Sequence, residues 1–378
     1  MPDRLRFNAT SRFEAARSVA ILPDGHRCRR LHGHGFLARV SADVPSGWAA
    51  HRGGEVETLS GCLDQVVAEL DYRFLNEMLA VPTDEELARW LRKRLERQSV
   101  AQRSVPGIET IGVQSTPDQG ADLAADGSVH VWRRFHFEAA HQLPHVPQGH
   151  QCGRMHGHGF AVVLHAQQQL AAGDHLGIDY DVLQERWKPF IHQLDHRCLN
   201  DITGLTNPTS EVLAAWVWER LKPQLPELSW VSVYETATAG CHFDGKQHRI
   251  WKEFTFEGAL RLTAAPENHQ ARRLHGHSYC LRLHLAAPLD QVLGWTVDYG
   301  DVKQLFTPIY RLLDHHDLNA LTGIEQPDAA SLLRWIRTQA APAMPQLDRI
   351  DLDERPGIGA TLSWGVDPPA LPALCQLP

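Results

Sequence analysis

The sequence has no hydrophobic run long enough to cross a membrane. Apolar residues make up 43% of the 378 residues and charged residues 22%, yet no apolar stretch approaches the eighteen or so residues that a spanning helix needs. The first residues, from Met1 to Arg6, have no apolar stretch behind their charges and do not resemble a secretory signal. We therefore expect a cytoplasmic globular protein without a membrane role.

Paired cysteines and long basic runs are also missing. The seven cysteines form an odd set without a CxxC pair, so we expect reduced thiols and no disulfide framework. The formal net charge is −8, and without a basic run no nucleic-acid partner is expected. Histidine, by contrast, occurs 23 times. This excess indicates metal or proton chemistry.

Three short patterns recur at the same two intervals. His-Gly-His begins at His32, again at His156 after 124 residues, and at His275 after a further 119. Leu-Asp followed by an aromatic residue or His, and Phe-Glu followed by Ala or Gly, keep the same intervals. Because unrelated patterns share their spacing, the chain is predicted to hold three copies of one unit, over 1–125, 126–246 and 247–378.

Each copy has the pattern strand-strand-helix-helix-strand-strand. In the middle copy we expect strands over 131–143, 160–165 and 229–238, a helix over 180–194, and a second helix from Asn207, its expected N-cap, to Leu221. The predicted fold class is α+β, an antiparallel four-stranded sheet with both helices on one face. Three such sheets, paired at their edges, would close a pseudo-trimeric barrel.

The middle copy contains a candidate metal site. His156 and His158 are two residues apart, so on a strand both imidazoles lie on the same face. A hairpin would fold His141, near the end of the preceding strand, back against them. Three imidazoles with an open fourth position are typical of catalytic zinc. A loop that merely needs glycine would explain a single His-Gly-His, but not the further features at fixed register.

Other middle-copy residues have two interpretations each. Cys152 could be a fourth zinc ligand, or a thiol base served by the Asp195-His196 pair. That pair could instead simply end a helix, with the imidazole stabilised by the helix dipole. Glu235, within an apolar strand, either faces solvent or binds a cationic or guanidine-like partner such as a pterin edge.

The middle copy resembles the 6-pyruvoyltetrahydropterin and 6-carboxytetrahydropterin synthases, over its whole length. The matching segments are FEAAH at 137–141, CGRMHGH at 152–158, LDH at 194–196, NPTSE at 207–211 and YET at 234–236. The short interval between the cysteine and the His-x-His pair is similar to that of the bacterial 6-carboxytetrahydropterin synthase of queuosine biosynthesis. The resemblance implies the tunnelling fold and a pterin substrate.

Residue roles follow from the resemblance position by position. It implies that Zn²⁺ is held by His141, His156 and His158, that Cys152 is the catalytic base assisted by Asp195 and His196, and that Glu235 anchors the pterin. The implied reaction converts 7,8-dihydroneopterin triphosphate to 6-carboxy-5,6,7,8-tetrahydropterin with loss of acetaldehyde and triphosphate. A pyruvoyltetrahydropterin synthase or related side-chain lyase, and a non-catalytic pterin-binding scaffold, remain alternatives.

The outer copies depart from this pattern. The first has Arg17, Tyr72 and Ser115 where the middle copy has His141, His196 and Glu235. The third has Leu260 and Ala271 in place of the first zinc ligand and the cysteine, although Asp314, His315 and Glu354 survive. Because two imidazoles make a poor zinc site, we expect catalytically inactive outer copies and about one zinc per chain.

The resemblance also bears on assembly. The family forms trimers paired into hexamers, so three fused units imply a homodimer. Its Asp-His pair comes from a neighbouring subunit, and if unit three serves unit two, Cys152 would meet Asp314 and His315. Random decay that spared this pair is the alternative. Either Glu235 or Glu354 would then anchor the pterin.

Overall fold

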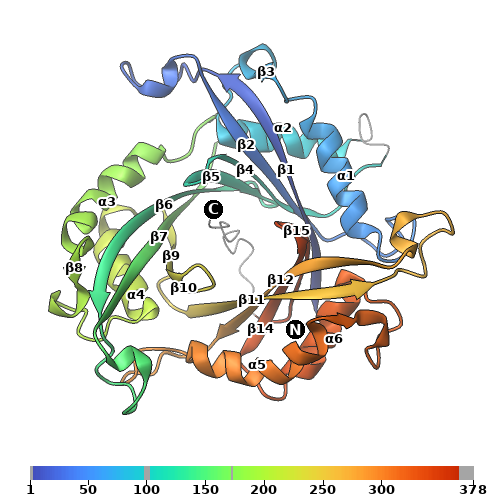
Figure 1. Cartoon of the computed structure of the whole chain (residues 1–378). Coiled ribbons are helices and arrows are strands. Elements are labelled where there is room, and N and C mark those ends of the chain that lie inside the picture. Colours follow the sequence, from blue (N-terminus) through green and yellow to red (C-terminus); the bar gives the residue numbers. More distant parts are fainter. Residues whose placement is uncertain (1–2, 98–102, 172, 366–378) are drawn as a thin grey trace.

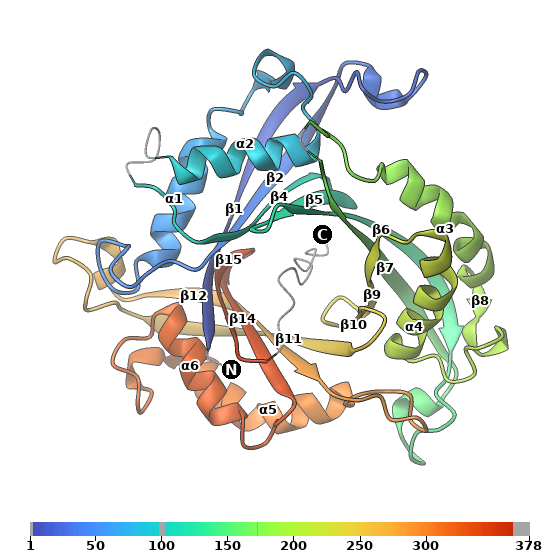
Figure 2. The same cartoon turned by 180° about the vertical axis from the view of Figure 1, so that it is seen from behind.

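The chain forms a closed barrel of 12 antiparallel strands, with helices on its outer surface (Figure 1). The computed structural model describes residues 3–97, 103–171 and 173–365. Seen from behind, the helices again lie outside the strands (Figure 2). The predicted α+β class, the three repeated units and the pseudo-trimeric barrel are therefore confirmed.

Each unit contributes four long strands and two helices. Unit one has β1 (Arg4–Arg17), β2 (His32–Ala42), α1 (Glu55–Val67), α2 (Asp84–Glu96), β4 (Ile108–Thr116) and β5 (Gln119–Ala124). Unit two has β6 (Ser128–His141), β7 (His156–Gln169), α3 (Tyr180–Leu194), α4 (Ser210–Leu221), β9 (Leu228–Thr236) and β10 (Ala239–Phe243). Unit three has β11 (His248–Leu260), β12 (His275–Ala286), α5 (Tyr299–Leu313), α6 (Ala329–Ala340), β14 (Leu347–Arg355) and β15 (Ile358–Ser363).

The barrel closes through pairing between units. Strand β5 pairs with β6, β10 with β11, and β15 with β1, all antiparallel. Each unit thus uses both of its sheet edges, and none of these described edge strands is left unpaired. The short strands β3 (Arg73–Phe74), β8 (Arg197–Cys198) and β13 (His316–Asp317) pair in parallel with the first strand of their own units.

The main core lies between the sheet and the helices. In unit two, α3 packs on β6 through Trp187, whose ring stacks on Phe135 at 5.1 Å and on Phe190 at 5.3 Å between centroids. A separate apolar cluster, which includes Trp132, Tyr234 and Trp251, lies on the other side of the sheet. None of the described helices is long and apolar enough to span a membrane.

The start of α4 differs from the prediction. The N-cap is Thr209, whose Oγ1 accepts the N–H of Val212 at 3.1 Å, and not Asn207. The helix begins only at Ser210, and the Asn207 amide donates instead to the carbonyl of Leu293 in unit three at 2.7 Å. The Asn207 side chain, which the local pattern predicts to cap α4, therefore forms a contact between units two and three instead.

Candidate active site

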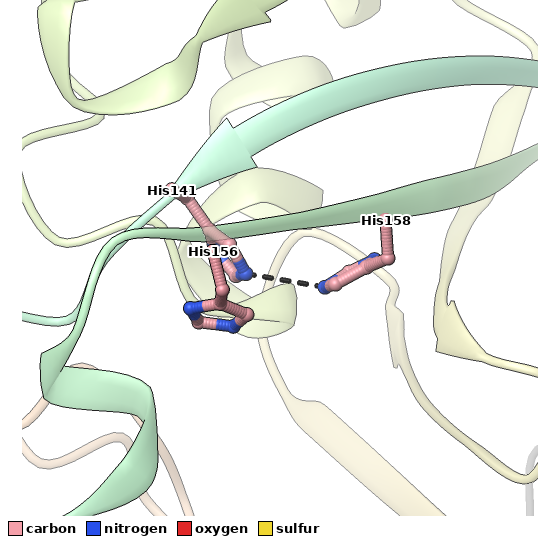
Figure 3. Close-up of side chains that lie close together, drawn as sticks. All are labelled: His141, His156 and His158. Atoms are coloured by element: carbon pink, nitrogen blue, oxygen red, sulfur yellow. Dashed lines mark hydrogen bonds between the residues drawn. The ribbon is translucent and has the colours of Figure 1, made fainter.

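Three histidines meet where β6 ends and β7 begins (Figure 3). His141 is paired with His156 across the two strands, and His158 is paired with Ala139, so all three imidazoles lie on the helix-facing side. Their ligand atoms all lie within 4.8 Å of one another. The Nε2 atoms of His141 and His158 are 3.1 Å apart.

Each imidazole is oriented by a hydrogen bond at its other nitrogen. The Nδ1–H groups of His141, His156 and His158 donate to the carbonyls of Pro208, Arg154 and Gly159, at 3.1, 2.8 and 3.2 Å. Backbone carbonyls can only accept, so each Nε2 keeps its lone pair. Burial lowers the pKa of His141 to about 4 and also lowers that of His158. All three rings are thus oriented to act as neutral ligands.

The cluster fits a tetrahedral zinc ion. Two nitrogens bound to zinc at 2.0–2.1 Å in tetrahedral geometry lie about 3.3 Å apart, close to the separation of the Nε2 atoms of His141 and His158. The three-imidazole set leaves a fourth position for water or substrate.

Cys152 lies in the hairpin loop between β6 and β7, on the short 3-10 helix η3 (Gln151–Gly153). Its pKa is raised by burial first, and then by the negative charges of Glu235 and Asp298. The protein groups alone therefore keep this thiol protonated at neutral pH. A thiolate here requires a nearby cation, and zinc is such a cation.

Two carboxyl groups, the half-buried Glu235 and the buried Glu211, act on one another, and the charge of Glu235 also acts on Cys152. The pKa of Glu235 is raised to about 7, mainly by burial and then by Glu211 and Asp298. Glu211, in the first turn of α4, accepts the backbone N–H of Thr296 at 2.9 Å and the hydroxyl of Ser210 at 3.0 Å. Glu211 is the last residue of the NPTSE segment, and its contact with unit three has no local signal in the sequence.

The site lies at the junction between units two and three. The hairpin loop of unit two reaches the start of α5 (Figure 1), where His150 Nε2 is 3.2 Å from the carboxylate of Asp298. Tyr299, the first residue of α5, is half-buried, and its hydroxyl lies 2.8 Å from that of Ser210 in a hydrogen bond. No local pattern could have identified Asp298 or Tyr299, because their place depends on which units meet.

Comparison with known proteins assigns the family. The family described as 6-pyruvoyl tetrahydropterin synthase matches residues 6–126, 130–246 and 249–363. The chain belongs to the 6-pyruvoyl tetrahydropterin synthase family.

Several relatives are named by activity. The 6-carboxy-5,6,7,8-tetrahydropterin synthase of Synechocystis sp. is 40% identical over 119 residues, which are 30% of this chain and 91% of that protein. The dihydroneopterin monophosphate aldolase of Pyrococcus furiosus is 29% identical over 105 residues, 27% of this chain and 89% of that protein. The family and its named synthases support a lyase activity for this chain.

A solved structure of the same family also matches. The region aligned with the 6-pyruvoyl tetrahydropterin synthase of Caenorhabditis elegans spans 31% of this chain and 95% of that protein. The sequence identity is 16% and the TM-score is 0.29.

Neither Asp-His pair of this family member contacts Cys152. Asp195 accepts the N–H of Glu138 at 3.0 Å, and the His196 side chain is 78% exposed. Asp314 and His315 follow the end of α5, whereas Asp298 precedes its start; 15 helical residues span about 22 Å. Among the described residues, no hydrogen bond joins Cys152 to either histidine. The catalytic roles of these pairs stay predictions, and within one chain they lack the required contact.

Glu354 lies at a different junction from Cys152. Burial raises the pKa of Glu354 to about 7. Arg355 opposes this increase, and the negative charges of Asp328, Asp353 and, last, the unit-one residue Glu57 add to it. These neighbours place Glu354 where unit three meets unit one. Of the two candidate anchors, only Glu235 lies close enough to Cys152 for its charge to raise the pKa of the thiol.

A second group of possible ligands is an ion-pair cluster between units one and two. His26, Asp179 and Asp181 have ligand atoms within 4.8 Å of one another. Arg27 and Arg133 both lie 3.4 Å from Asp181. These guanidinium groups already neutralise the carboxylate, so the cluster makes a poor metal site.

Proposed function

We propose that this chain is a zinc-dependent 6-carboxy-5,6,7,8-tetrahydropterin synthase. It would convert 7,8-dihydroneopterin triphosphate to its product with release of acetaldehyde and triphosphate, in queuosine biosynthesis. The observation that supports it best is the complete set of His141, His156 and His158 beside Cys152 and Glu235, in a family whose named relatives include such synthases.

The three histidines would hold zinc through their Nε2 atoms. Bound zinc polarises substrate oxygens and acidifies the adjacent C–H bonds. Cys152 would exchange protons with the side chain of the substrate. Glu235 would accept two N–H groups from the guanidine-like edge of the pterin, which requires its ionised form.

The remaining acid-base pair would come from a second chain. Both His196 and His315 project from the barrel with side chains more than three-quarters exposed. A homodimer in which two barrels stack would bring one of these pairs to Cys152 of the other chain. The active site would then be completed only in the dimer.

The test is incubation of the zinc-loaded protein with 7,8-dihydroneopterin triphosphate, with products identified by mass spectrometry. We expect 6-carboxytetrahydropterin and acetaldehyde in equal amounts, and loss of both in Cys152→Ala. A 6-pyruvoyl or other pterin product would support a related side-chain lyase instead. Binding of substrate without any turnover would identify a pterin-binding scaffold.

A further inference from the structure

The histidine two residues before each cysteine position makes the same backbone contact in all three units. His26, His150 and His269 are the N-caps of η1 (Arg27–Arg29), η3 and η6 (Gln270–Arg272). Each Nδ1 accepts the N–H two residues further on, at 3.1, 3.2 and 3.3 Å. An accepting Nδ1 places the proton of the neutral ring on Nε2.

Each of these Nε2 atoms faces a carboxylate of the next unit. The distances are 3.0 Å from His26 to Asp181, 3.2 Å from His150 to Asp298 and 3.4 Å from His269 to Glu57. Asp298 is the N-cap of α5, and the other two acids lie in the first turns of α3 and α1. One such contact therefore crosses each of the three junctions, from unit one to two, two to three and three to one.

We propose that His150 is a positioning residue for the reaction. It joins the backbone N–H of Cys152 to Asp298 of unit three, and so fixes the thiol beside the three zinc-ligand histidines. Its catalytic consequence rests on the proposed function, whereas its effect on the position of the thiol does not.

The charges at the bridge argue for positioning and against activation of the thiol. A negative Asp298 raises the pKa of Cys152 and so disfavours the thiolate. The contact therefore opposes ionisation electrostatically. What it supplies is a fixed attachment of the loop, since the imidazole holds the backbone at one nitrogen and the neighbouring helix at the other.

The outer units provide matched controls for this bridge. In unit three the same bridge, from His269 to Glu57, supports a turn with Ala271 in place of the cysteine. Removing His269 should therefore weaken a junction between units to a similar extent without touching a reactive thiol. A difference between the His150 and His269 variants isolates the effect on Cys152.

The experiment compares His150→Ala, His269→Ala and Asp298→Asn in the full zinc-loaded chain. Iodoacetamide labelling of Cys152, followed by peptide mass spectrometry, should be several-fold faster in His150→Ala, because the turn is released. It should match wild type in His269→Ala. In Asp298→Asn, a side-chain oxygen remains to cap α5, but the charge that raises the pKa of Cys152 is lost. Labelling of this variant should be faster only through easier ionisation of the thiol, and the increase in His150→Ala should be larger.

Turnover provides the second measurement. His150→Ala should lower kcat by about 10- to 100-fold with KM nearly unchanged, as expected for a misplaced catalytic group, while His269→Ala stays near wild type. An unchanged labelling rate in His150→Ala would overturn the proposal, and so would equal losses of kcat in His150→Ala and His269→Ala. If wild type shows no turnover, the proposed function fails and labelling alone decides the role of His150.

Discussion

At the scale of single residues, Arg17 shows what unit one has in place of the first candidate metal ligand. It stands where unit two has His141, and its guanidinium donates to Asp84 at 2.6 Å and to the carbonyl of Pro82 at 3.0 Å. Burial, and then the charge of Arg17, lower the pKa of His34 to about 4. A fixed positive charge beside the surviving imidazoles disfavours a metal cation in this pocket.

Replacing Arg17 should destabilise the fold. Arg17→Ala leaves the buried carboxylate of Asp84 without its cation, which costs about 3 kcal/mol of unfolding free energy. Urea denaturation followed by circular dichroism measures this loss. Lys188→Ala removes an exposed ion pair with Glu185 (53% and 63% exposed side chains) and should cost less than about 1 kcal/mol. Equal effects of the two substitutions would show that the Arg17 pair is not energetically special.

Glu235 and Glu354 should affect the stability of the fold in the same way, although only Glu235 is expected to bind substrate. Both carboxyls have a pKa of about 7 in the folded chain against an ordinary value of 4.5. Between these values the unfolded chain loses its proton first, so each group reduces stability as pH rises from about 4.5 to 7, and the penalty is complete above 7. Either Glu→Gln substitution should therefore raise stability at pH 8, by up to about 3 kcal/mol, and have little effect near pH 4.

Only one of these two substitutions should affect the reaction. Glu235→Gln should lower kcat/KM by about 10- to 100-fold, because the hydrogen bonds that the pterin N–H groups donate to a charged carboxylate are lost. Glu354→Gln, at the other junction, should leave kcat/KM within twofold of wild type. Substrate affinity of wild type should increase with pH through about 7 as Glu235 ionises. A turnover defect in Glu354→Gln alone would reverse the assignment of the anchor.

At the scale of elements, the corner after the first helix of each unit is strained in the same way. Tyr72, His196 and His315 have positive φ angles of 53°, 55° and 58°. In each, the N–H donates to a first-strand carbonyl, at 2.7, 2.6 and 2.6 Å. The preceding aspartate accepts an N–H from the same strand in all three units. The corner thus has a structural role that survives in the unit where histidine is lost.

Relieving this strain should stabilise unit one. Tyr72→Gly should raise the unfolding free energy by about 0.5–1 kcal/mol, because glycine adopts positive φ without a Cβ clash. The Tyr72 side chain is 84% exposed, so little packing is lost. Tyr72→Ala keeps the Cβ and serves as the control, with no gain expected. A gain of equal size in both variants would point to the tyrosine ring, and not to the backbone, as the source.

Some elements could be predicted from the sequence and others could not. The three copies followed from three motifs that share the same two intervals, and the order of strands and helices from the apolar pattern within a copy. The grouping of His141, His156 and His158 followed from the alternation of side chains along paired strands. The predicted N-cap of α4 was wrong because the Asn207 side chain donates its hydrogen bond to Leu293 of unit three. The roles of His150, Glu211 and Asp298 were missed for the same reason. Each depends on contacts between units that no local pattern encodes.

At the scale of the whole molecule, three units should hold one metal ion. Unit one has Arg17 and unit three has Leu260 where the third imidazole would stand, so among the described residues only unit two brings three histidine nitrogens together. Metal analysis of purified protein should give about one zinc per chain. His156→Ala should lose both zinc and activity, because a three-ligand site has no spare donor. Close to three zinc ions per chain would contradict the loss of the outer sites.

The assembly determines which Asp-His pair serves Cys152. Because neither His196 nor His315 reaches that thiol within one chain, the pair should come from the second chain of a homodimer, and light scattering should detect a dimer. His315→Ala is predicted to lower the rate by about 10²- to 10⁴-fold, and His196→Ala much less. A large loss of rate in His196→Ala with little loss in His315→Ala would assign the role to Asp195-His196.

Mixing two inactive variants tests the exchange between chains directly. After subunit exchange, Cys152→Ala and His315→Ala chains form mixed dimers in which one of the two sites combines an intact Cys152 with an intact His315 of the partner chain. With half of the dimers mixed and one working site in each, about a quarter of wild-type activity should return. The same mixture without exchange, held below the exchange temperature, is the control. If exchange is verified by mass spectrometry and no activity returns, the two groups act within one chain and the structure must change shape to bring them together.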